Sequence, residues 1–306
     1  MTETTYDVAV LGSGPAGITA AIYTQRYELK TVLIGNSWGG AIAKTHIIEN
    51  YPGFTSVGGF DFMQQWTGHL QHLGIQEVTD NINKIERLDD GTFKIYVDFG
   101  EAPITAKSIV YTLGTEERKL GVEGEEKLLG RGVSYCATCD GPFFKGKKVS
   151  VIGGSDTAAK EALYLSQVTE KVSILYRRDE IRPEPINKKR VEENSKIDVI
   201  PRTTITSING TEKVESVTLN NGDKFPTDGV FIEIGADPRS KMAKAIGIAV
   251  NDKEEIIVDE QMHTNIPGFF AAGDVVNRRE KQVVVAAGHG AIAAFSVRDY
   301  IESKKS

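Results

Sequence analysis

The stretch YDVAVLGSGPAG at residues 6–17 decides the fold class of this chain. Its first half is rich in apolar and β-branched residues, which is typical of a buried strand. A G-x-G-x-x-G pattern follows at once, then a helical stretch to about residue 27 and a second apolar strand at residues 31–34. A strand, a helix and a strand with this pattern at the first turn are typical of a dinucleotide-binding unit.

The glycines of this turn have separate physical roles. The first permits the tight passage from strand to helix, the second lets backbone N–H groups approach a pyrophosphate, and the third lets helix and strand pack closely. The N-terminus of the helix adds a partial positive charge. The turn is therefore predicted to bind the phosphates of a dinucleotide through Gly12, Ser13, Gly14, Pro15, Ala16 and Gly17.

The same organisation occurs a second time, beginning with KVSVIGGSDTA at residues 148–158. In each copy a helix and a strand follow the glycine turn, and a hairpin, a closing strand and another glycine come later. These later features are DDG at 89–91, the strand at 108–112 and Gly114 in the first copy, and NNG at 220–222, the strand at 230–234 and Gly235 in the second. Because the order is preserved, the sequence predicts an α/β protein with two Rossmann-like, three-layer ββα nucleotide-binding domains.

Length and composition agree with two ordinary globular domains. The chain has 306 residues and a net charge of −6, so it offers no broad basic surface for nucleic acid. No apolar run approaches the length of a membrane span, and the first residues lack the pattern of a secretory leader. We therefore expect a cytoplasmic protein with neither nucleic acid nor membrane as a partner.

The two cysteines of the chain, Cys136 and Cys139, form a single C-x-x-C. A structural zinc site needs four Cys or His ligands, and none of the five histidines lies close to the pair in sequence, so no metal is expected. A disulfide between positions three apart removes little entropy from the unfolded chain, which argues against a purely structural role. The pair is therefore predicted to be redox-active.

Three arginines of the second copy indicate which nucleotide it binds. Arg177, Arg178 and Arg182 follow its second strand, at the place that contacts the adenosine ribose in such units. Guanidinium groups there can hold a 2′-phosphate through charge-assisted bonds, which favours NADPH over NADH. The alternative reading is a solvated charged turn. Near the C-terminus, a short apolar strand ends in Gly273 and Asp274, where the carboxylate could accept a hydrogen bond from a ribityl hydroxyl.

Together these features resemble the low-molecular-weight thioredoxin reductase family of FAD-dependent pyridine nucleotide-disulfide oxidoreductases. The resemblance extends over nearly the whole chain, and the CATCD stretch between the two nucleotide units is its most specific part. The motifs that carry it are GSGPAG at 12–17, ENYPGF at 49–54, GRGVSYCATCDG at 130–141, GGSDTA at 153–158, YRRDEIR at 176–182 and AAGDV at 271–275.

The resemblance implies a discontinuous FAD-binding domain at residues 1–116 and 246–306, with an NAD(P)H-binding domain at 117–245 inserted and carrying the C-x-x-C. It also implies a homodimer. The expected FAD contacts beyond the first glycine turn are Gly39, Gly40, Asn50, Gly114, Gly273, Asp274, Lys281, Gln282 and Val283. The expected NADPH contacts are Gly153, Gly154, Ser155, Asp156, Thr157, Ala158, Arg177, Arg178 and Arg182.

The activity implied by the resemblance is a relay of two electrons from NADPH through FAD and the Cys136–Cys139 disulfide to the disulfide of thioredoxin or a thioredoxin-like protein. In such a relay Cys139 is the sulfur that faces the flavin and Cys136 is the interchange thiol. Asp140 follows the pair directly, and a carboxyl there can act as the acid and base for the leaving thiolate. Its alternative role is that of a turn residue before Gly141.

The chain departs from the family pattern at several positions. Ser155 stands where the middle glycine of the second fingerprint is expected, and Tyr176 replaces the usual histidine before the arginines. Ala41 and Leu113 replace a glutamine and a threonine of the flavin side. Ser155 favours a related disulfide reductase with another donor, such as reduced ferredoxin or another flavin, whereas the arginines oppose it. A flavin ferredoxin–NADP reductase would not need the cysteines, and a redox sensor without turnover is a further alternative.

Overall fold

The chain folds into two compact units within residues 5–305, the part that the computed structural model describes. One unit combines the chain up to Glu116 with the chain from Pro238 onwards, and Glu117–Asp237 form the other. The second unit is therefore inserted into the first, which confirms this feature of the predicted fold class. The two crossings carry short strands that pair with each other, β7 (Thr115–Glu117) and β16 (Ala236–Pro238).

The return to the first unit lies directly after Asp237. The boundary expected from the sequence, between residues 245 and 246, is wrong because the chain joins the first unit earlier. Tyr111 Oη donates a hydrogen bond to the carbonyl of Arg239 (2.5 Å), and Ala243 is fully buried in the core of the first unit. These contacts attach the segment before the expected boundary is reached.

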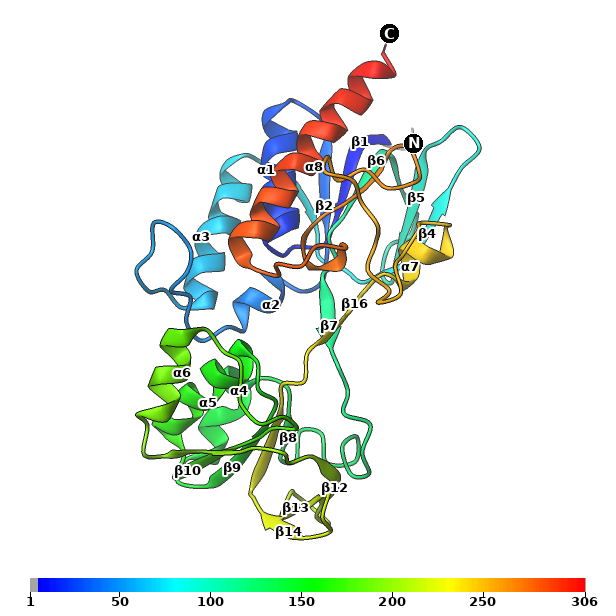
Figure 1. Cartoon of the computed structure of the whole chain (residues 1–306). Helices are drawn as coiled ribbons and strands as arrows, with labels where there is room; N and C mark the ends of the chain where they lie inside the picture. The colour runs from blue at the N-terminus through cyan, green and yellow to red at the C-terminus, as the bar shows by residue number, and fades with distance from the viewer. Residues whose placement is uncertain (1–4, 306) are drawn as a thin grey trace. The chain divides into compact units, whose positions relative to one another are not determined.

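A seven-stranded sheet forms the centre of the first unit (Figure 1). Its strand order is β3-β2-β1-β6-β5-β4, and β17 also pairs with β6. Five strands run parallel, whereas the hairpin β4-β5 joins β6 in antiparallel fashion. The strands are β1 (Thr5–Leu11), β2 (Thr31–Ile34), β3 (Gln76–Val78), β4 (Ile82–Arg87), β5 (Phe93–Val97), β6 (Ile104–Tyr111) and β17 (Phe269–Ala271). The first β-α-β unit is thus confirmed.

Helices α1 and α8 lie side by side against this sheet (Figure 1). They approach closely because Gly290 of α8 has no side chain, and a Cβ there would lie 2.2 Å from the carbonyl oxygen of Ala16 in α1. The helices of the unit are α1 (Pro15–Arg26), α2 (Gly40–Ala43), α3 (Gly59–His72), α7 (Lys241–Ala245), the 3₁₀ turn η2 (Gly273–Val275) and α8 (Val283–Ser303).

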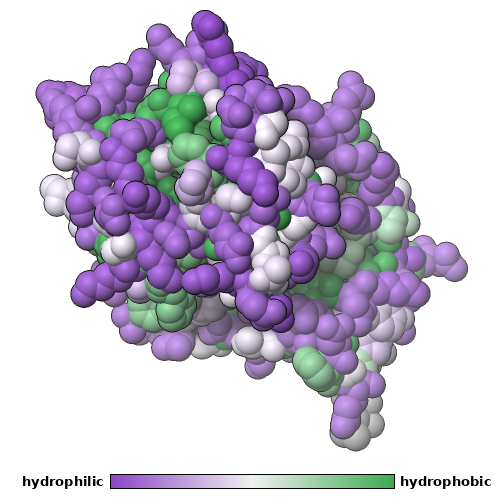
Figure 2. Space-filling model, turned by 90° about the horizontal axis from the view of Figure 1, so that it is seen from below, coloured by the Kyte–Doolittle hydropathy of each residue, from purple (hydrophilic) through white to green (hydrophobic). Residues whose placement is uncertain are grey.

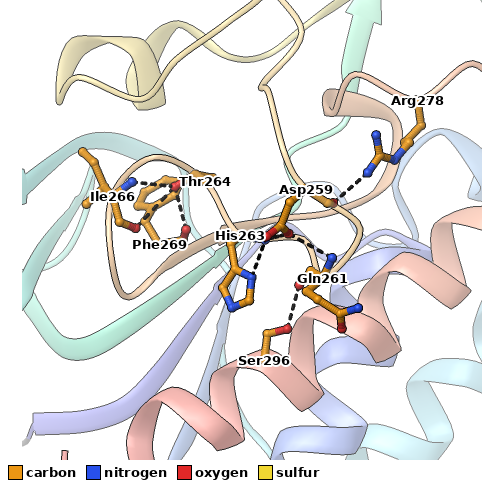
Figure 3. A network of polar contacts seen from close by, with 8 residues as sticks. All are labelled: Asp259, Gln261, His263, Thr264, Ile266, Phe269, Arg278 and Ser296. Atoms are coloured by element: carbon orange, nitrogen blue, oxygen red, sulfur yellow. Dashed lines mark hydrogen bonds and ion pairs between the residues drawn. The ribbon is translucent and has the colours of Figure 1, made fainter. Parts of the chain in front are cut away.

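Polar contacts fasten the loop that precedes β17 to helix α8 (Figure 3). The carboxylate of Asp259 accepts hydrogen bonds from the backbone N–H groups of Gln261 and His263, each at 2.9 Å, and contacts His263 Nδ1 at 3.0 Å. Ser296 Oγ of α8 donates to the Gln261 carbonyl, and Arg278 donates to the Asp259 carbonyl, both at 2.6 Å. The network therefore fixes the segment that leads into β17 and the turn after it.

The second unit has three layers, as predicted for a ββα nucleotide-binding domain. Neighbouring residues of a strand point to opposite faces of its sheet. Accordingly, Val151 packs among helical residues such as Ala162, whereas Ile152 packs with residues of the antiparallel sheet such as Val217. The parallel sheet has the order β11-β10-β9-β15-β8, and the antiparallel sheet has the order β12-β13-β14.

The strands of this unit are β8 (Val133–Ser134), β9 (Lys148–Ile152), β10 (Lys171–Leu175), β11 (Ile197–Ile200), β12 (Ile205–Asn209), β13 (Ser216–Leu219), β14 (Lys224–Pro226) and β15 (Gly229–Ile232). Its helices are α4 (Ala137–Asp140), the 3₁₀ turn η1 (Gly141–Phe144), α5 (Asp156–Val168) and α6 (Pro185–Glu192). The second β-α-β unit, β9-α5-β10, is thus confirmed.

The surface is predominantly polar on the face drawn in Figure 2, where apolar residues gather in separate patches among hydrophilic ones. Across residues 5–305, no helix has both the length and the apolar character needed to cross a bilayer.

Candidate redox and nucleotide sites

Cys136 and Cys139 form a disulfide in the second unit, with their Cα atoms 5.4 Å apart. Cys136 ends the segment after β8, and Cys139 lies in the short helix α4. Ser134 Oγ accepts a hydrogen bond from the Cys136 N–H (3.0 Å), and the Cys139 N–H points at Cys136 Sγ (3.2 Å). A backbone N–H directed at sulfur stabilises a thiolate. The geometry therefore suits Cys136 for nucleophilic chemistry once the disulfide is reduced.

Asp140 is the last residue of α4, directly after the disulfide. Its backbone N–H donates to the Cys136 carbonyl (3.1 Å), which closes the turn around the two sulfurs. Its side chain is half-buried. The structure therefore places a carboxyl within the same short turn as both cysteines, where a proton donor for a thiolate is needed.

Sequence reasoning missed two glutamates, Glu161 next to this turn and Glu233 close to Glu161. Glu161 Oε1 of α5 accepts a hydrogen bond from the N–H of Ala137 (3.2 Å), the residue that follows Cys136. Burial raises the pKa of Glu161, and burial together with the nearby Glu161 carboxylate raises the pKa of Glu233. One signal was available, because Glu233 is the single charged residue in the apolar segment at 230–234.

The first glycine turn is shaped as a phosphate cradle. Gly12 has φ +112°, and a Cβ there would lie 2.4 Å from the Thr112 carbonyl oxygen. A Cβ at Gly17 would lie 1.8 Å from the Gly12 carbonyl oxygen, so helix and strand touch at this point. Around Gly14, by contrast, the nearest protein atom to a built Cβ is Gly40 Cα at 3.9 Å. The protein thus leaves space at the middle glycine alone, where a pyrophosphate is expected.

Several other predicted FAD residues come together in the first unit. Gly40 lies beside Gly14, and a Cβ on Gly273 would lie 2.9 Å from the Cβ of Ala16. Asn50 Nδ2 donates to Gln282 Oε1 (3.0 Å), although the two residues are far apart in sequence. The remaining predicted positions border these groups in the chain: Ser13 donates to the Ser37 carbonyl, Pro15 begins α1, Gly39 caps α2, Val283 begins α8, and Gly114 follows β6.

Two polar groups of the first unit have room for hydrogen-bond partners that FAD could supply. Burial raises the pKa of Asp274 even though Lys281 lowers it, so this carboxyl is short of donors. His289 Nδ1 is buried and makes no hydrogen bond to any described residue. Hydroxyl groups and phosphate oxygens can satisfy such atoms, so the residues fit the cofactor. Lys281 Nζ itself binds the carbonyl oxygens of Asp274 (3.0 Å) and Val276 (2.6 Å) and thereby holds the turn.

The second glycine turn uses its serine as a helix cap. Gly153 has φ +151°, and a Cβ there would lie 2.2 Å from the Glu233 carbonyl oxygen. Ser155 is the N-cap of α5, and its Oγ accepts a hydrogen bond from the Ala158 N–H (3.4 Å). The hydroxyl is therefore directed toward its own helix. Thr157 lies in the first turn of this helix.

The arginines of the second unit differ in their surroundings. The ring of Tyr176 lies over Gly154, where a Cβ would be 2.5 Å from it, and its hydroxyl accepts a hydrogen bond from Arg182 Nε (3.2 Å). Arg182 is thus partly engaged by the protein. Arg177 and Arg178 are exposed, which suits them for a phosphate.

Asp156, which was expected to contact the nucleotide, is occupied by protein donors. Its Oδ1 accepts from the Glu184 N–H and from Asn187 Nδ2, both at 2.9 Å, and its Oδ2 binds Lys160 Nζ at 2.7 Å. These contacts anchor the start of α6 beside α5. Across the described part of the chain, no group of three or more His, Cys, Asp or Glu residues has the arrangement of a metal site.

Comparisons with known proteins show the family to which the chain is similar. The profile of the pyridine nucleotide-disulphide oxidoreductase family matches residues 6–290. A thioredoxin reductase from Bacillus subtilis (strain 168) is 41% identical over 309 residues, covering 98% of this chain and 96% of that protein. The structure of Lactococcus lactis thioredoxin reductase in its FR conformation matches with a TM-score of 0.93 at 38% identity, covering 97% of this chain and 99% of that one. A ferredoxin-flavin thioredoxin reductase from Clostridium acetobutylicum matches with a TM-score of 0.56 at 33% identity, covering 99% of each chain.

Proposed function

Because the chain belongs to the pyridine nucleotide-disulphide oxidoreductases, and among them to the low-molecular-weight thioredoxin reductase family, we propose that it transfers electrons from NADPH through FAD to the disulfide of a thioredoxin-like protein. The observation that carries this proposal is the Cys136–Cys139 disulfide, which lies in the same unit as the second glycine turn. The proposal also includes thioredoxin as the partner, a homodimer and a cytoplasmic location, each of which is supported by the family.

The first unit is the one proposed to hold FAD. Gly14 leaves room for the pyrophosphate, and Asp274 offers a half-buried carboxyl to the ribityl hydroxyls. Bound FAD would accept a hydride equivalent from NADPH and supply the electron pair that reduces the disulfide. The second unit would hold NADPH, with Arg177 and Arg178 on the 2′-phosphate and the N-terminus of α5 toward the pyrophosphate.

The cysteines exchange electrons with the partner by two displacements. The Cys136 thiolate attacks one sulfur of the partner disulfide, which forms a mixed disulfide and releases the partner's other sulfur as a thiolate. The Cys139 thiolate then attacks Cys136 Sγ, which restores the Cys136–Cys139 bond and frees the partner as a dithiol. Asp140 supplies a proton to a leaving thiolate. In the balance, NADPH, one proton and a protein disulfide give NADP⁺ and a protein dithiol.

Asp140→Asn is expected to lower the turnover with oxidised thioredoxin about a hundredfold, since general acid catalysis typically contributes at least that factor. FAD content should not change, because the side chain lies in the second unit. Steady-state NADPH oxidation measures the effect. Asp252→Asn, which alters an exposed carboxylate of the first unit, is the control. Unchanged turnover in the FAD-loaded Asp140 variant would remove the residue from the reaction.

The double variant Arg177→Ala, Arg178→Ala is expected to raise the KM for NADPH by about tenfold or more, because charge-assisted bonds to a 2′-phosphate are lost. The KM for NADH, which has no such phosphate, should stay the same and serves as the internal control. Equal changes for both nucleotides would show that the arginines do not read the 2′-phosphate.

A second candidate function is the same disulfide reduction with ferredoxin as the electron donor. It is favoured by Ser155 in place of the middle glycine and by the Tyr176 ring over Gly154. The two candidates are separated by turnover with oxidised thioredoxin, supplied in parallel with NADPH and with reduced ferredoxin. Turnover with NADPH supports the first proposal. Turnover with reduced ferredoxin alone would replace it by the second.

A further inference from the structure

Glu161 lies next to the disulfide-bearing turn and Glu233 lies close to Glu161, and the exchange chemistry described above uses neither. Glu161 Oε1 accepts the N–H of Ala137, which joins the carboxyl to the residue between the cysteines. Glu233 follows β15 directly, and its carboxyl lies close enough to that of Glu161 for the two negative charges to repel each other. Glu161 Oε2 is buried, and no group of residues 5–305 donates a hydrogen bond to it.

Two carboxylates are both acceptors, so a hydrogen bond between them requires a proton on one. The surroundings also disfavour two negative charges, because burial penalises each charge and the two repel each other. The next charge that acts on Glu233 is Glu117, which is acidic as well. The cation of α5, Lys160, is engaged by Asp156 at 2.7 Å. Among residues 5–305, the charged groups that act on this pair include no cation that could take the place of a proton.

We propose that Glu161 and Glu233 share a single proton and act as a positioning pair for the Cys136–Cys139 turn. Through Glu161 Oε1 the pair holds the Ala137 N–H, which fixes the backbone between the sulfurs. The shared proton supplies the donor that Glu161 Oε2 lacks and limits the charge next to the sulfurs to one negative unit. Since a nearby negative charge raises thiol pKa values, this limit keeps thiolates accessible near neutral pH. The inference depends on the proposed function in one respect only, which is that the Cys136–Cys139 disulfide positioned by the pair is the one that exchanges electrons with the partner.

Infrared spectroscopy of the oxidised holoprotein, labelled with ¹³C in its glutamate carboxyls, tests the shared proton. At pH 8 exposed glutamates are ionised, since their ordinary pKa is near 4.3. We expect the carboxylic-acid band of one protonated glutamate to persist at that pH. It should vanish both in Glu161→Gln and in Glu233→Gln, because an amide then donates to the remaining carboxylate. Glu77→Gln is the control, since burial also raises the pKa of Glu77.

The absence of this band in the parent protein would overturn the proposal, and so would its survival in both glutamine variants. The positioning role is tested by a separate measurement, the hydrogen-exchange rate of the Ala137 N–H. Glu233→Gln keeps a donor for Glu161 and should leave the exchange rate unchanged, whereas Glu233→Ala should speed it about tenfold, as expected for loss of one hydrogen bond. Equal rates in these two variants would show that Glu233 does not support the turn.

The charge of the pair is tested by the pH profile of alkylation of the cysteines, reduced with dithiothreitol so that neither NADPH nor turnover is involved. A pair that holds one proton carries one negative charge, and so does each single glutamine variant. The profile should therefore coincide in the parent and both single variants, and shift to lower pH only in the double variant Glu161→Gln, Glu233→Gln. Asp140 is unchanged throughout. A stepwise shift from parent to single to double variant would mean that both carboxyls are ionised. Because no assay uses turnover, failure here is distinguishable from failure of the proposed function.

Discussion

Replacing Cys139 by serine is expected to lower turnover with oxidised thioredoxin to less than ~0.1% of the parent value, because the second displacement needs a thiolate that serine does not provide. FAD content and the reduction of bound FAD by NADPH should remain, since the cradle of the first unit is unaltered. Steady-state and anaerobic single-turnover measurements separate these two properties. Substantial turnover in the variant would contradict the role of the pair.

The complementary variant Cys136→Ser distinguishes the roles of the two sulfurs. If Cys136 is the interchange thiol, the Cys139→Ser protein should form a stable mixed disulfide with a thioredoxin that retains only its attacking cysteine, activated as a mixed disulfide with an aromatic thiol. The Cys136→Ser protein should not form it. The Cys139 N–H directed at Cys136 Sγ (3.2 Å) supports this order, because it stabilises a thiolate on Cys136. Trapping by Cys139 alone would reverse the assignment.

Gly17→Ala is expected to yield a protein without FAD and with a free energy of unfolding lowered by about 1–3 kcal/mol, as is typical of overpacking. The added Cβ would lie 1.8 Å from the Gly12 carbonyl oxygen and 2.7 Å from Thr112 Oγ1. Backbone must therefore move, and α1 must separate from the sheet. Urea unfolding and the visible absorbance of the purified protein measure the two effects.

Gly14→Ala is the matched control for this change. A Cβ at Gly14 has no protein atom closer than 3.9 Å, so stability without FAD should match that of the parent. The methyl group would nevertheless occupy the approach to the pyrophosphate, and FAD affinity should fall about tenfold or more, which corresponds to about 1.4 kcal/mol. Unaltered affinity in this variant would move the cofactor away from the turn.

The sequence predicts the architecture wherever a local pattern of residues determines the structure. The strands, glycine turns and helices that begin at residues 6 and 148 follow from hydrophobic runs and from backbone that only glycine allows, as at Gly12 and Gly153. The return crossing after Asp237 was not readable, because it depends on the packing of Ala243 into a core formed by distant residues. No local signal separates that segment from the unit it leaves.

The site was predictable to the same extent. The C-x-x-C and the residues of the glycine turns carry their chemistry in their spacing, so they could be predicted directly. The Tyr176 ring lies over Gly154 only once β9 and β10 pair, and Glu161 meets Glu233 only once α5 and β15 come together, so no spacing in the chain predicts either contact. At Ser155 the residue type was known from the sequence, but the direction of its side chain was not. Its hydroxyl turns toward α5 and caps that helix.

The central claim, that NADPH delivers electrons through FAD to the Cys136–Cys139 disulfide, is tested most directly by anaerobic titration of the purified protein with NADPH and, in parallel, with NADH. We predict that the flavin absorbance is bleached by near-stoichiometric NADPH and that NADH requires a higher concentration. Bleaching by dithionite but by neither nucleotide would contradict the account, since the flavin would then be competent while the second unit no longer accepts a nicotinamide donor.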